Sequence, residues 1–295
     1  MNSSLQAAVQ TFIEKEKLPE DYAETVELWF MPLALQLLQV ISTSHKVPLI
    51  GISGCQGSGK STLASLLVIL LRELMGIKCI NLSLDDFYLS FAKRQDLSKS
   101  VHPLFATRGV PGTHDVDLAI STIQALGKKG EVAIPRFNKA LDDRVSKEQW
   151  SVIQAPVDAI IFEGWCLNIV EQDESELIEA INSLEKNEDP EGLWRQFANL
   201  QIKENYSSLY DLVDYLIMLK APSFEKVFEW RQKQEDKLAG QQESLSESRV
   251  MNQAELQRFI QHYERITRHG MKTLPGHADV VFELSDEQTI QRKVQ

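Results

Sequence analysis

The chain has 295 residues, of which 43% are hydrophobic and 25% charged, the composition of an ordinary soluble globular protein. Its 42 acidic residues outnumber its 31 basic ones and give a formal net charge of −11 at pH 7. This balance argues against a broad nucleic-acid-binding or anionic-membrane surface, since either needs clustered positive charge. It leaves room for a small basic pocket that binds phosphates.

The cysteines and the apolar stretches bear on where the protein works. Cys55, Cys79 and Cys166 are odd in number and never form a C-x-x-C pair, so neither a disulfide framework nor a zinc site is expected. The first residues lack the basic and apolar regions of a secretory signal. The most apolar stretch, 29–41, is shorter than a membrane span. We therefore expect a cytoplasmic protein with no membrane or nucleic-acid partner, and the sequence leaves its oligomeric state open.

Hydrophobic periodicity divides the chain into helices and strands. Residues 1–45 carry apolar residues at helical spacing and predict a helical N-terminal extension. Residues 46–295 predict one domain, in which a helix at 60–75 is stopped by Gly76. Alternating helices and strands predict an α/β fold, a three-layer sandwich around a mainly parallel sheet. The expected strands lie at 47–53, 77–84, 157–163, 212–219 and 279–284.

Two segments of this domain are unusually polar. Residues 171–205 are acidic, carry turn residues at 187–190 and predict a helical insertion. Residues from about 230 to 255 are rich in Gln, Glu and Arg, with few large apolar side chains. They predict either a mobile lid or a merely exposed helix.

The most specific motif is GCQGSGKS at 54–61, a complete G-x-x-x-x-G-K-[ST] loop between an expected strand and an expected helix. The glycines let backbone N–H groups turn inward around an anion, and the following helix adds its positive dipole end. Lys60 supplies charge for the β- and γ-phosphates, and the Ser61 hydroxyl is a Mg²⁺ ligand. We expect nucleoside triphosphate contacts from Gly54, Gln56, Gly57, Ser58, Gly59, Lys60, Ser61 and Thr62.

Three classes of phosphate-binding-loop protein compete. A GTPase needs N-K-x-D, and the nearest match, NKAL at 138–141, has leucine in place of the aspartate. A transporter-type ATPase needs L-S-G-G-Q, and LAGQQ at 238–242 is an imperfect match far beyond the strand at 157–163. Both classes are disfavoured, and a small-molecule kinase is the favoured interpretation. A nucleotide switch, in which hydrolysis only changes conformation, is the non-metabolic alternative.

Carboxylates end two of the expected strands. Asp85 and Asp86 follow the second strand, at the edge where open α/β sheets place their chemistry. A kinase needs a carboxylate that orients the acceptor hydroxyl and accepts its proton, and we assign this catalytic role to Asp85. Asp86 then either faces away or joins the catalytic residues, as a second Mg²⁺ ligand or a second base. Glu163 ends another strand and is expected to hold Mg²⁺ with Ser61 and Asp85, because a buried carboxylate without a partner is unfavourable.

Several segments resemble a known group of kinases. Together with the phosphate-binding loop, SLDDFY at 83–88 and FEGW at 162–165 resemble the phosphoribulokinase, uridine kinase and pantothenate kinase group. TRGVPGTHD at 107–115, IPRFNKALDD at 134–143 and FEGWCL at 162–167 more closely resemble D-glycerate 3-kinases of the plant and cyanobacterial type. The resemblance runs from about residue 48 to about residue 284. It implies transfer of a phosphoryl group from MgATP to D-glycerate, giving 3-phosphoglycerate.

The resemblance also implies site residues. It places Arg231, Lys233 or Lys237 of a lid helix on the phosphates. An anionic acceptor such as glycerate further needs a cation, and a guanidinium binds a carboxylate through two hydrogen bonds. The candidate acceptor contacts are Arg108, His114, Asp115, Arg136 and Lys139. A nucleoside, pantothenate or a polyol remains an alternative acceptor.

Overall fold

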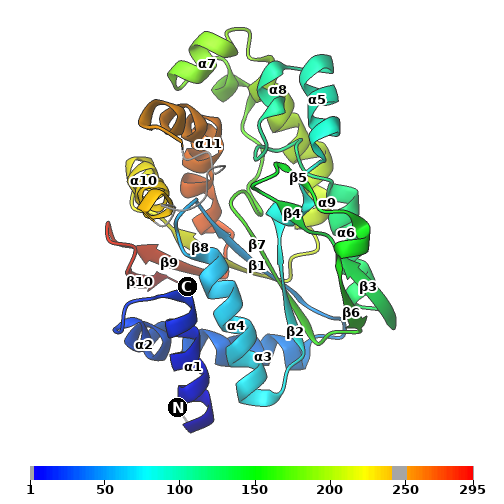
Figure 1. Cartoon of the computed structure of the whole chain (residues 1–295), viewed down its shortest axis with the longest axis vertical. Coiled ribbons are helices and arrows are strands. Elements are labelled where there is room, and N and C mark those ends of the chain that lie inside the picture. Colours follow the sequence, from blue (N-terminus) through cyan, green and yellow to red (C-terminus); the bar gives the residue numbers. More distant parts are fainter. Residues whose placement is uncertain (1–2, 241–250, 295) are drawn as a thin grey trace.

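The structure is a computed structural model that describes residues 3–240 and 251–294. At its centre lies a six-stranded sheet of order β10-β9-β8-β1-β7-β2 (Figure 1). Neighbouring strands pair in parallel, except that β10 runs antiparallel to β9. The sheet strands are β1 (Leu49–Gly54), β2 (Cys79–Ser83), β7 (Ala159–Gly164), β8 (Tyr215–Lys220), β9 (Val280–Leu284) and β10 (Ile290–Val294).

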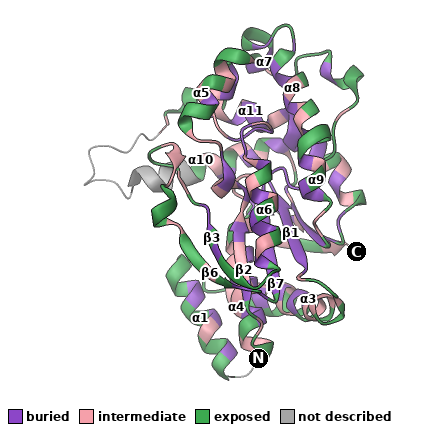
Figure 2. Cartoon of the chain, turned by 90° about the vertical axis from the view of Figure 1, so that its right-hand side faces the viewer, coloured by how far each residue is buried: buried purple, intermediate pink, exposed green. Residues whose placement is uncertain are grey.

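The five strands expected from the sequence are all present in this sheet, and β10 is an addition. Strands β1 and β7 are buried along their whole length, which explains why they are apolar without alternation (Figure 2). The register pairs Ser53 with Gly164 and Ser83 with Glu163. The carboxyl ends of β1, β7 and β2 therefore meet at one edge of the sheet. The phosphate-binding loop and the motifs FEGW and SLDDFY lie at these ends.

Helices cover the sheet, and two small antiparallel hairpins stand beside it. The hairpins were not expected; they pair β3 (Gly130–Ile134) with β6 (Ser151–Ala155), and β4 (Phe137–Asn138) with β5 (Asp143–Arg144). The α-helices are α1 (Ser3–Glu16), α2 (Tyr22–Thr25), α3 (Met31–Thr43), α4 (Lys60–Met75), α5 (Phe91–Ser100), α6 (Val116–Leu126), α7 (Ser183–Glu188), α8 (Leu193–Gln201), α9 (Ser207–Tyr210), α10 (Phe224–Gly240) and α11 (Gln253–Thr273). Short 3-10 turns cover Leu84–Phe87, Pro103–Ala106, Lys147–Gln149, Glu174–Leu177 and Leu274–Gly276, and π-helical turns cover Val26–Phe30 and Ile202–Tyr206.

The N-terminal segment is helical, as predicted, and it packs into the main core. Buried side chains of α1 and α3 join those of α4 and β9 in one apolar cluster, and Figure 1 shows α1 beside α4. The run Tyr22–Thr43 is 22 residues long, and by length and composition alone it is long enough to cross a membrane. It exceeds the apolar stretch seen in the sequence because residues 22–28 continue the helix. Its buried residues Val26, Phe30, Leu33 and Leu37 belong to the core cluster.

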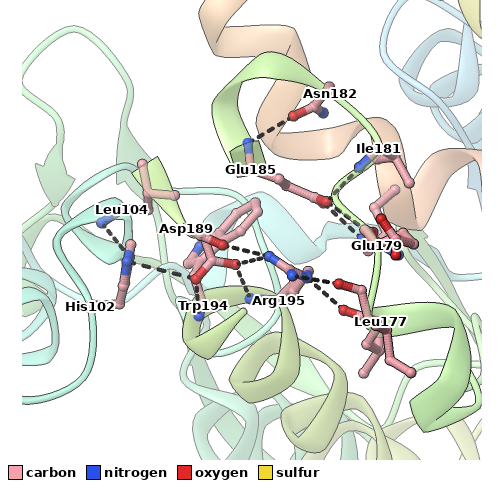
Figure 3. A network of polar contacts seen from close by, with 12 residues as sticks. His102, Leu104, Leu177, Glu179, Ile181, Asn182, Glu185, Asp189, Trp194 and Arg195 are labelled. Carbon is pink, nitrogen blue, oxygen red and sulfur yellow. Dashed lines mark hydrogen bonds and ion pairs between the residues drawn. The ribbon is translucent and has the colours of Figure 1, made fainter. Parts of the chain in front are cut away.

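The insertion expected at 171–205 contains α7 and α8 and is held by buried ion pairs. Arg195 pairs with Asp189 at 2.9 Å and also donates to the carbonyl of Leu177 at 2.7 Å (Figure 3). Arg265 of α11 pairs with Glu185 of α7 at 2.6 Å. These contacts fix the insertion against α11. The lid expected at about 230–255 begins on α10, whereas its residues 241–250 lie outside the described residues.

Candidate active site

The phosphate-binding loop lies between the end of β1 and the start of α4 at Lys60, as its sequence predicts. Gly57 and Gly59 have φ angles of 80° and 86°, in the left-handed region that glycine adopts without strain. An added β-carbon at Gly54 would lie 2.6 Å from Ser58 Oγ, so the loop needs a glycine where it begins as well. The free N–H groups and positive dipole end of α4 face this loop.

A cavity of about 460 Å³ opens above the loop. Gln56 and Thr62 line it, and the buried side-chain oxygens of Gln56 and Ser58 have no hydrogen-bond partner within the described residues. The remaining walls come from elements far apart in the sequence. They are formed by Asp85 and Tyr88 after β2, Arg108 and Lys139 from two loops, Trp165 after β7, Arg231 of α10, and Phe259 and Tyr263 of α11. The sheet edge thus gathers one carboxylate and several cations around the phosphate-binding loop.

Glu163 and Ser61 form a site that suits Mg²⁺. The Ser61 hydroxyl donates to Glu163 Oε1 at 2.8 Å, and Lys60 Nζ lies 4.0 Å from Oε2. Glu163 is buried, and its Oε2 has no hydrogen-bond partner in the described part of the chain. No cluster of three His, Cys, Asp or Glu side chains occurs among the described residues. One carboxylate and one hydroxyl suit Mg²⁺, which takes few protein ligands and completes its shell with phosphates and water.

Both carboxylate oxygens of Asp85 accept hydrogen bonds. The Tyr88 hydroxyl donates to Oδ1 at 2.8 Å, and Lys139 Nζ donates to Oδ2 at 2.6 Å. Burial acts to raise the pKa of Asp85, but the charges of Lys139 and Lys60 and the two hydrogen bonds outweigh it and lower the pKa to about 2. Asp85 is therefore ionised at neutral pH and can accept a hydrogen bond from an alcohol.

Asp86 faces away from the cavity, one of the two orientations that the sequence left open. Arg136 donates to Asp86 Oδ2 at 2.6 Å, and the Phe137 N–H donates to Oδ1 at 3.3 Å. Burial raises the pKa of Asp86, and Arg136 partly opposes this. The predicted catalytic role of Asp86 and acceptor contact of Arg136 do not fit this geometry, because the two side chains bind each other. Together they anchor the β4–β5 hairpin, which carries Lys139.

Arg108 lines the cavity, as predicted, and an ionic cluster holds its guanidinium. Arg108 pairs with Asp142, and the buried Arg94 pairs with the same carboxylate at 3.0 Å. The guanidinium of Arg108 also lies 5.5 Å from the centre of the Phe137 ring. These contacts keep one cation at the cavity wall in a fixed position.

Two aromatic residues fix the backbone of the loop that carries Arg108. The Tyr263 hydroxyl donates to the Arg108 carbonyl at 3.0 Å, and Trp165 Nε1 donates to the Gly109 carbonyl at 3.0 Å. Burial is the main cause that raises the pKa of Tyr263, so its hydroxyl keeps its proton. Tyr263 thereby links α11 to the loop that carries Arg108.

His114 and Asp115 lie behind the cavity and do not line it. His114 is buried, its Nδ1 is 2.6 Å from the Tyr206 hydroxyl, and its ring stacks on Tyr88 at 4.5 Å. Burial lowers the pKa of His114 to about 4, so the ring is neutral at pH 7. Asp115 caps the N-terminus of α6 and pairs with Arg144 at 3.1 Å. The predicted acceptor contacts of both residues do not fit this geometry. His114 supports the Tyr88 ring and Asp115 caps α6 instead.

A second cavity of about 480 Å³ adjoins the first, and sequence reasoning missed it. The two share the loop residues Gly57, Gly59 and Thr62. Aromatic and aliphatic side chains form about half of its wall, and polar groups, including those at the turn between β9 and β10, form the rest. Gln288 in this turn donates its side-chain amide to the Gly57 carbonyl at 2.7 Å. The apolar wall comprises Leu18, Tyr22, Phe30, Leu63, Leu219, Trp230, Leu284 and Ile290.

Four aromatic residues of the first cavity were not assigned a role from the sequence. Tyr88 and Trp165 lie within the motifs SLDDFY and FEGW, close to carboxylates with predicted roles. These motifs could therefore have indicated that the two rings line the site. Phe259 and Tyr263 lie on α11, where only their helical spacing is visible in the sequence. Arg231 lines the cavity as expected, with its guanidinium 5.9 Å from the centre of the Phe259 ring.

No family model matches the chain. A protein of Schizosaccharomyces pombe named uncharacterized kinase mug58 is 33% identical over 226 residues, which cover 73% of this chain and 78% of that protein. The chloroplastic D-glycerate 3-kinase of Arabidopsis thaliana is 29% identical over 192 residues, which cover 62% of this chain and 40% of the plant protein.

Among solved structures, D-glycerate 3-kinase from Cryptococcus neoformans matches with a TM-score of 0.73 at 21% identity. The match covers 90% of this chain and 97% of the cryptococcal chain. The α/β sandwich with a mainly parallel sheet, predicted from the sequence, is confirmed.

Proposed function

This chain belongs to the same family of P-loop kinases as the S. pombe protein, and we propose that it phosphorylates D-glycerate with ATP. The products are 3-phosphoglycerate and ADP. One observation carries the proposal: the carboxylate of Asp85 faces the phosphate-binding loop in a cavity that Arg108 and Lys139 also line. Such a cavity suits an acceptor with a hydroxyl at one end and a carboxylate at the other.

The nucleotide occupies the two adjoining cavities. The loop N–H groups and Lys60 hold the triphosphate, and Arg231 contacts it from α10. The base lies in the second cavity, against the aromatic wall that includes Tyr22 and Trp230. Mg²⁺, held by Ser61 and Glu163, supplies positive charge to the phosphate oxygens. The orphaned oxygen of Glu163 is the observation that supports this placement.

The acceptor enters the first cavity with its carboxylate toward Arg108 and Lys139. Asp85 orients the hydroxyl at C3 and accepts its proton as that oxygen bonds to the γ-phosphorus. The bond between the γ-phosphorus and the bridging oxygen breaks, and ADP leaves with its electron pair. Positioning and charge neutralisation supply most of the acceleration, because the base is weak.

The setting follows from the same proposal. We place the enzyme in the cytoplasm, with a small molecule as its acceptor and without a nucleic-acid or membrane partner. The acidic balance of the chain, 42 acidic against 31 basic residues, supports the absence of a nucleic-acid or anionic-membrane partner.

The test is ADP release by the purified protein with MgATP and a panel of acceptors. The panel holds D-glycerate, L-glycerate, glycerol, uridine, pantothenate and no acceptor. We expect release that depends on D-glycerate, and phosphorus NMR of the product should show phosphate on C3. Release that depends on another panel member would reject glycerate, and equal release without any acceptor would reject the metabolic kinase.

A further inference from the structure

Asp85 has no oxygen that is free of a protein partner. Tyr88 donates to Oδ1 at 2.8 Å, and Lys139 donates to Oδ2 at 2.6 Å. A carboxylate oxygen can accept more than one hydrogen bond, but an alcohol or a water molecule that is to use Asp85 as its base has to compete with these donors for the charge of the carboxylate. The Tyr88 ring is buried and stacked on His114, so its hydroxyl is held in place.

Lys139 is the more easily displaced donor. It belongs to the short connection between β4 and β5, and its side chain is 62% exposed. Within the described residues its ammonium contacts no carboxylate besides Asp85. Arg108 shares Asp142 with the buried Arg94 and is fixed by comparison. Ion pairs of exposed side chains are weak, so a competing carboxylate can replace Asp85 as the partner of Lys139 at a small cost in free energy.

We propose that Lys139 gates the catalytic base, and that the carboxylate of the acceptor opens this gate. Without an acceptor, the ammonium occupies Asp85 Oδ2. When the acceptor binds, its carboxylate takes Lys139 as a partner, and Oδ2 becomes available to the acceptor hydroxyl. This inference rests on the proposed function for the acceptor's identity, although the gate itself requires only an anionic acceptor.

The gate has two consequences for the reaction. Water carries no negative charge to draw Lys139 away, so the ion pair with Asp85 persists and slows ATP hydrolysis when the acceptor is absent. A neutral alcohol such as glycerol meets the same obstacle, because it must separate the ion pair without offering a new partner. Acceptor selection therefore acts on the chemical step, in addition to binding.

The test removes the ammonium with Lys139→Met and measures ATP hydrolysis without an acceptor. We expect hydrolysis at saturating ATP to rise about fivefold, the upper limit for removing an exposed ion pair from the base. The preference for D-glycerate over glycerol in kcat/KM should fall by at least about tenfold. Lys139→Arg keeps a cation at this position and should keep hydrolysis low.

Lys93→Met is the matched control. Lys93 is also 62% exposed and lies 3.7 Å from an aspartate, Asp115, which does not line the cavity. Hydrolysis by this control should equal that of the wild type. ATP affinity, measured for each variant, shows that the nucleotide site remains folded.

Two outcomes separate the gate from the proposed function. If Lys139→Met hydrolyses ATP no faster than the wild type and only its KM for D-glycerate rises, Lys139 is a simple contact and the gate is rejected. If the wild type does not phosphorylate D-glycerate, the proposed function fails. The hydrolysis measurement still decides on the gate in that case, because it needs only ATP and water.

Discussion

Tyr263 lies so close to Gly109 that a β-carbon at position 109 would come within 2.2 Å of its hydroxyl oxygen. Gly109 also has a φ angle of 131°, which other residues rarely adopt. The contact places α11 directly against the loop that carries Arg108. The backbone of the cavity wall around Arg108 thus depends on a glycine and an aromatic residue more than 150 positions apart.

Gly109→Ala should therefore weaken acceptor use and leave the nucleotide site intact. The methyl group forces the loop and Tyr263 apart, and overpacking of this kind costs about 1–3 kcal/mol. We expect KM for D-glycerate to rise while the dissociation constant of ATP stays unchanged. Gly276→Ala is the control, because an added β-carbon there meets nothing within 4 Å. Equal loss of ATP affinity in Gly109→Ala would show that the loop serves the nucleotide site as well.

Asp85→Asn tests the base. The amide keeps the shape of the carboxylate but cannot accept the hydroxyl proton, so kcat should fall by about 100- to 10,000-fold. ATP binding, measured by calorimetry, should stay nearly intact because Lys60 and the loop remain. Asp86→Asn is the comparison: its side chain faces Arg136, and kcat should fall far less. A similar loss of kcat in both variants would contradict the assignment of Asp85.

His114 predicts a pH-dependent stability. Its pKa is about 4 in the folded chain, against an ordinary value of 6.5, because burial disfavours the charged ring. Between these pH values the unfolded chain binds more protons, so the free energy of unfolding falls as the pH is lowered, by up to roughly 1.4 kcal/mol per unit. Urea unfolding of His114→Gln between pH 7 and 5 should show a shallower decline than the wild type. His45→Gln removes an exposed histidine and should keep the wild-type slope.

The ion pair between Arg265 and Glu185 predicts a large loss of stability on breaking it. Both side chains are buried, and Arg265 Nε and Nη2 reach the two carboxylate oxygens at 2.7 and 2.6 Å. Arg265→Met leaves a buried carboxylate unpaired and should lower the free energy of unfolding by about 3–5 kcal/mol. The double variant with Glu185→Leu should recover most of this loss. Arg268→Met breaks an exposed pair with Glu225 and should cost less than about 1 kcal/mol.

Tyr22 tests the role of the N-terminal helices in nucleotide binding. It lines the second cavity, so Tyr22→Ala should weaken ATP binding about tenfold, the typical loss of one base-stacking contact. Tripolyphosphate lacks a base, and its affinity should not change. Leu28→Ala is the control, since Leu28 lies on the same helical run and is 64% exposed. Parallel losses for ATP and tripolyphosphate would place the base elsewhere.

Local patterns predicted the framework of this fold well. The phosphate-binding loop and the helix Lys60–Met75 follow from glycine spacing and apolar periodicity, which are properties of short segments. The division at residue 45 remains a prediction, although α1 and α3 clearly share their core with α4. Strands β4 and β5 were not predicted because strands of two residues leave almost no periodic pattern.

The orientation of the site residues depends on long-range packing. Asp85 and Asp86 are adjacent, and nothing in SLDDFY shows which carboxylate faces the nucleotide. The segment 136–144 fixes the two orientations, because Lys139 pairs with Asp85 and Arg136 pairs with Asp86. His114 likewise looked like a substrate contact until its partner proved to be Tyr206, 92 residues away.

The hairpin anchored by Arg136 bears on which acceptors the cavity can admit. Asp86 holds the start of the hairpin through Arg136, while Lys139 at the tip of the hairpin lines the first cavity. If the proposed gate holds, the length of this hairpin sets how far Lys139 can move from Asp85 when the acceptor binds, and so which acceptors fit between them. Surface loops tolerate insertions and deletions. A change in the length of this one short loop should thus alter which acceptor fits, while the phosphate-binding loop stays as it is.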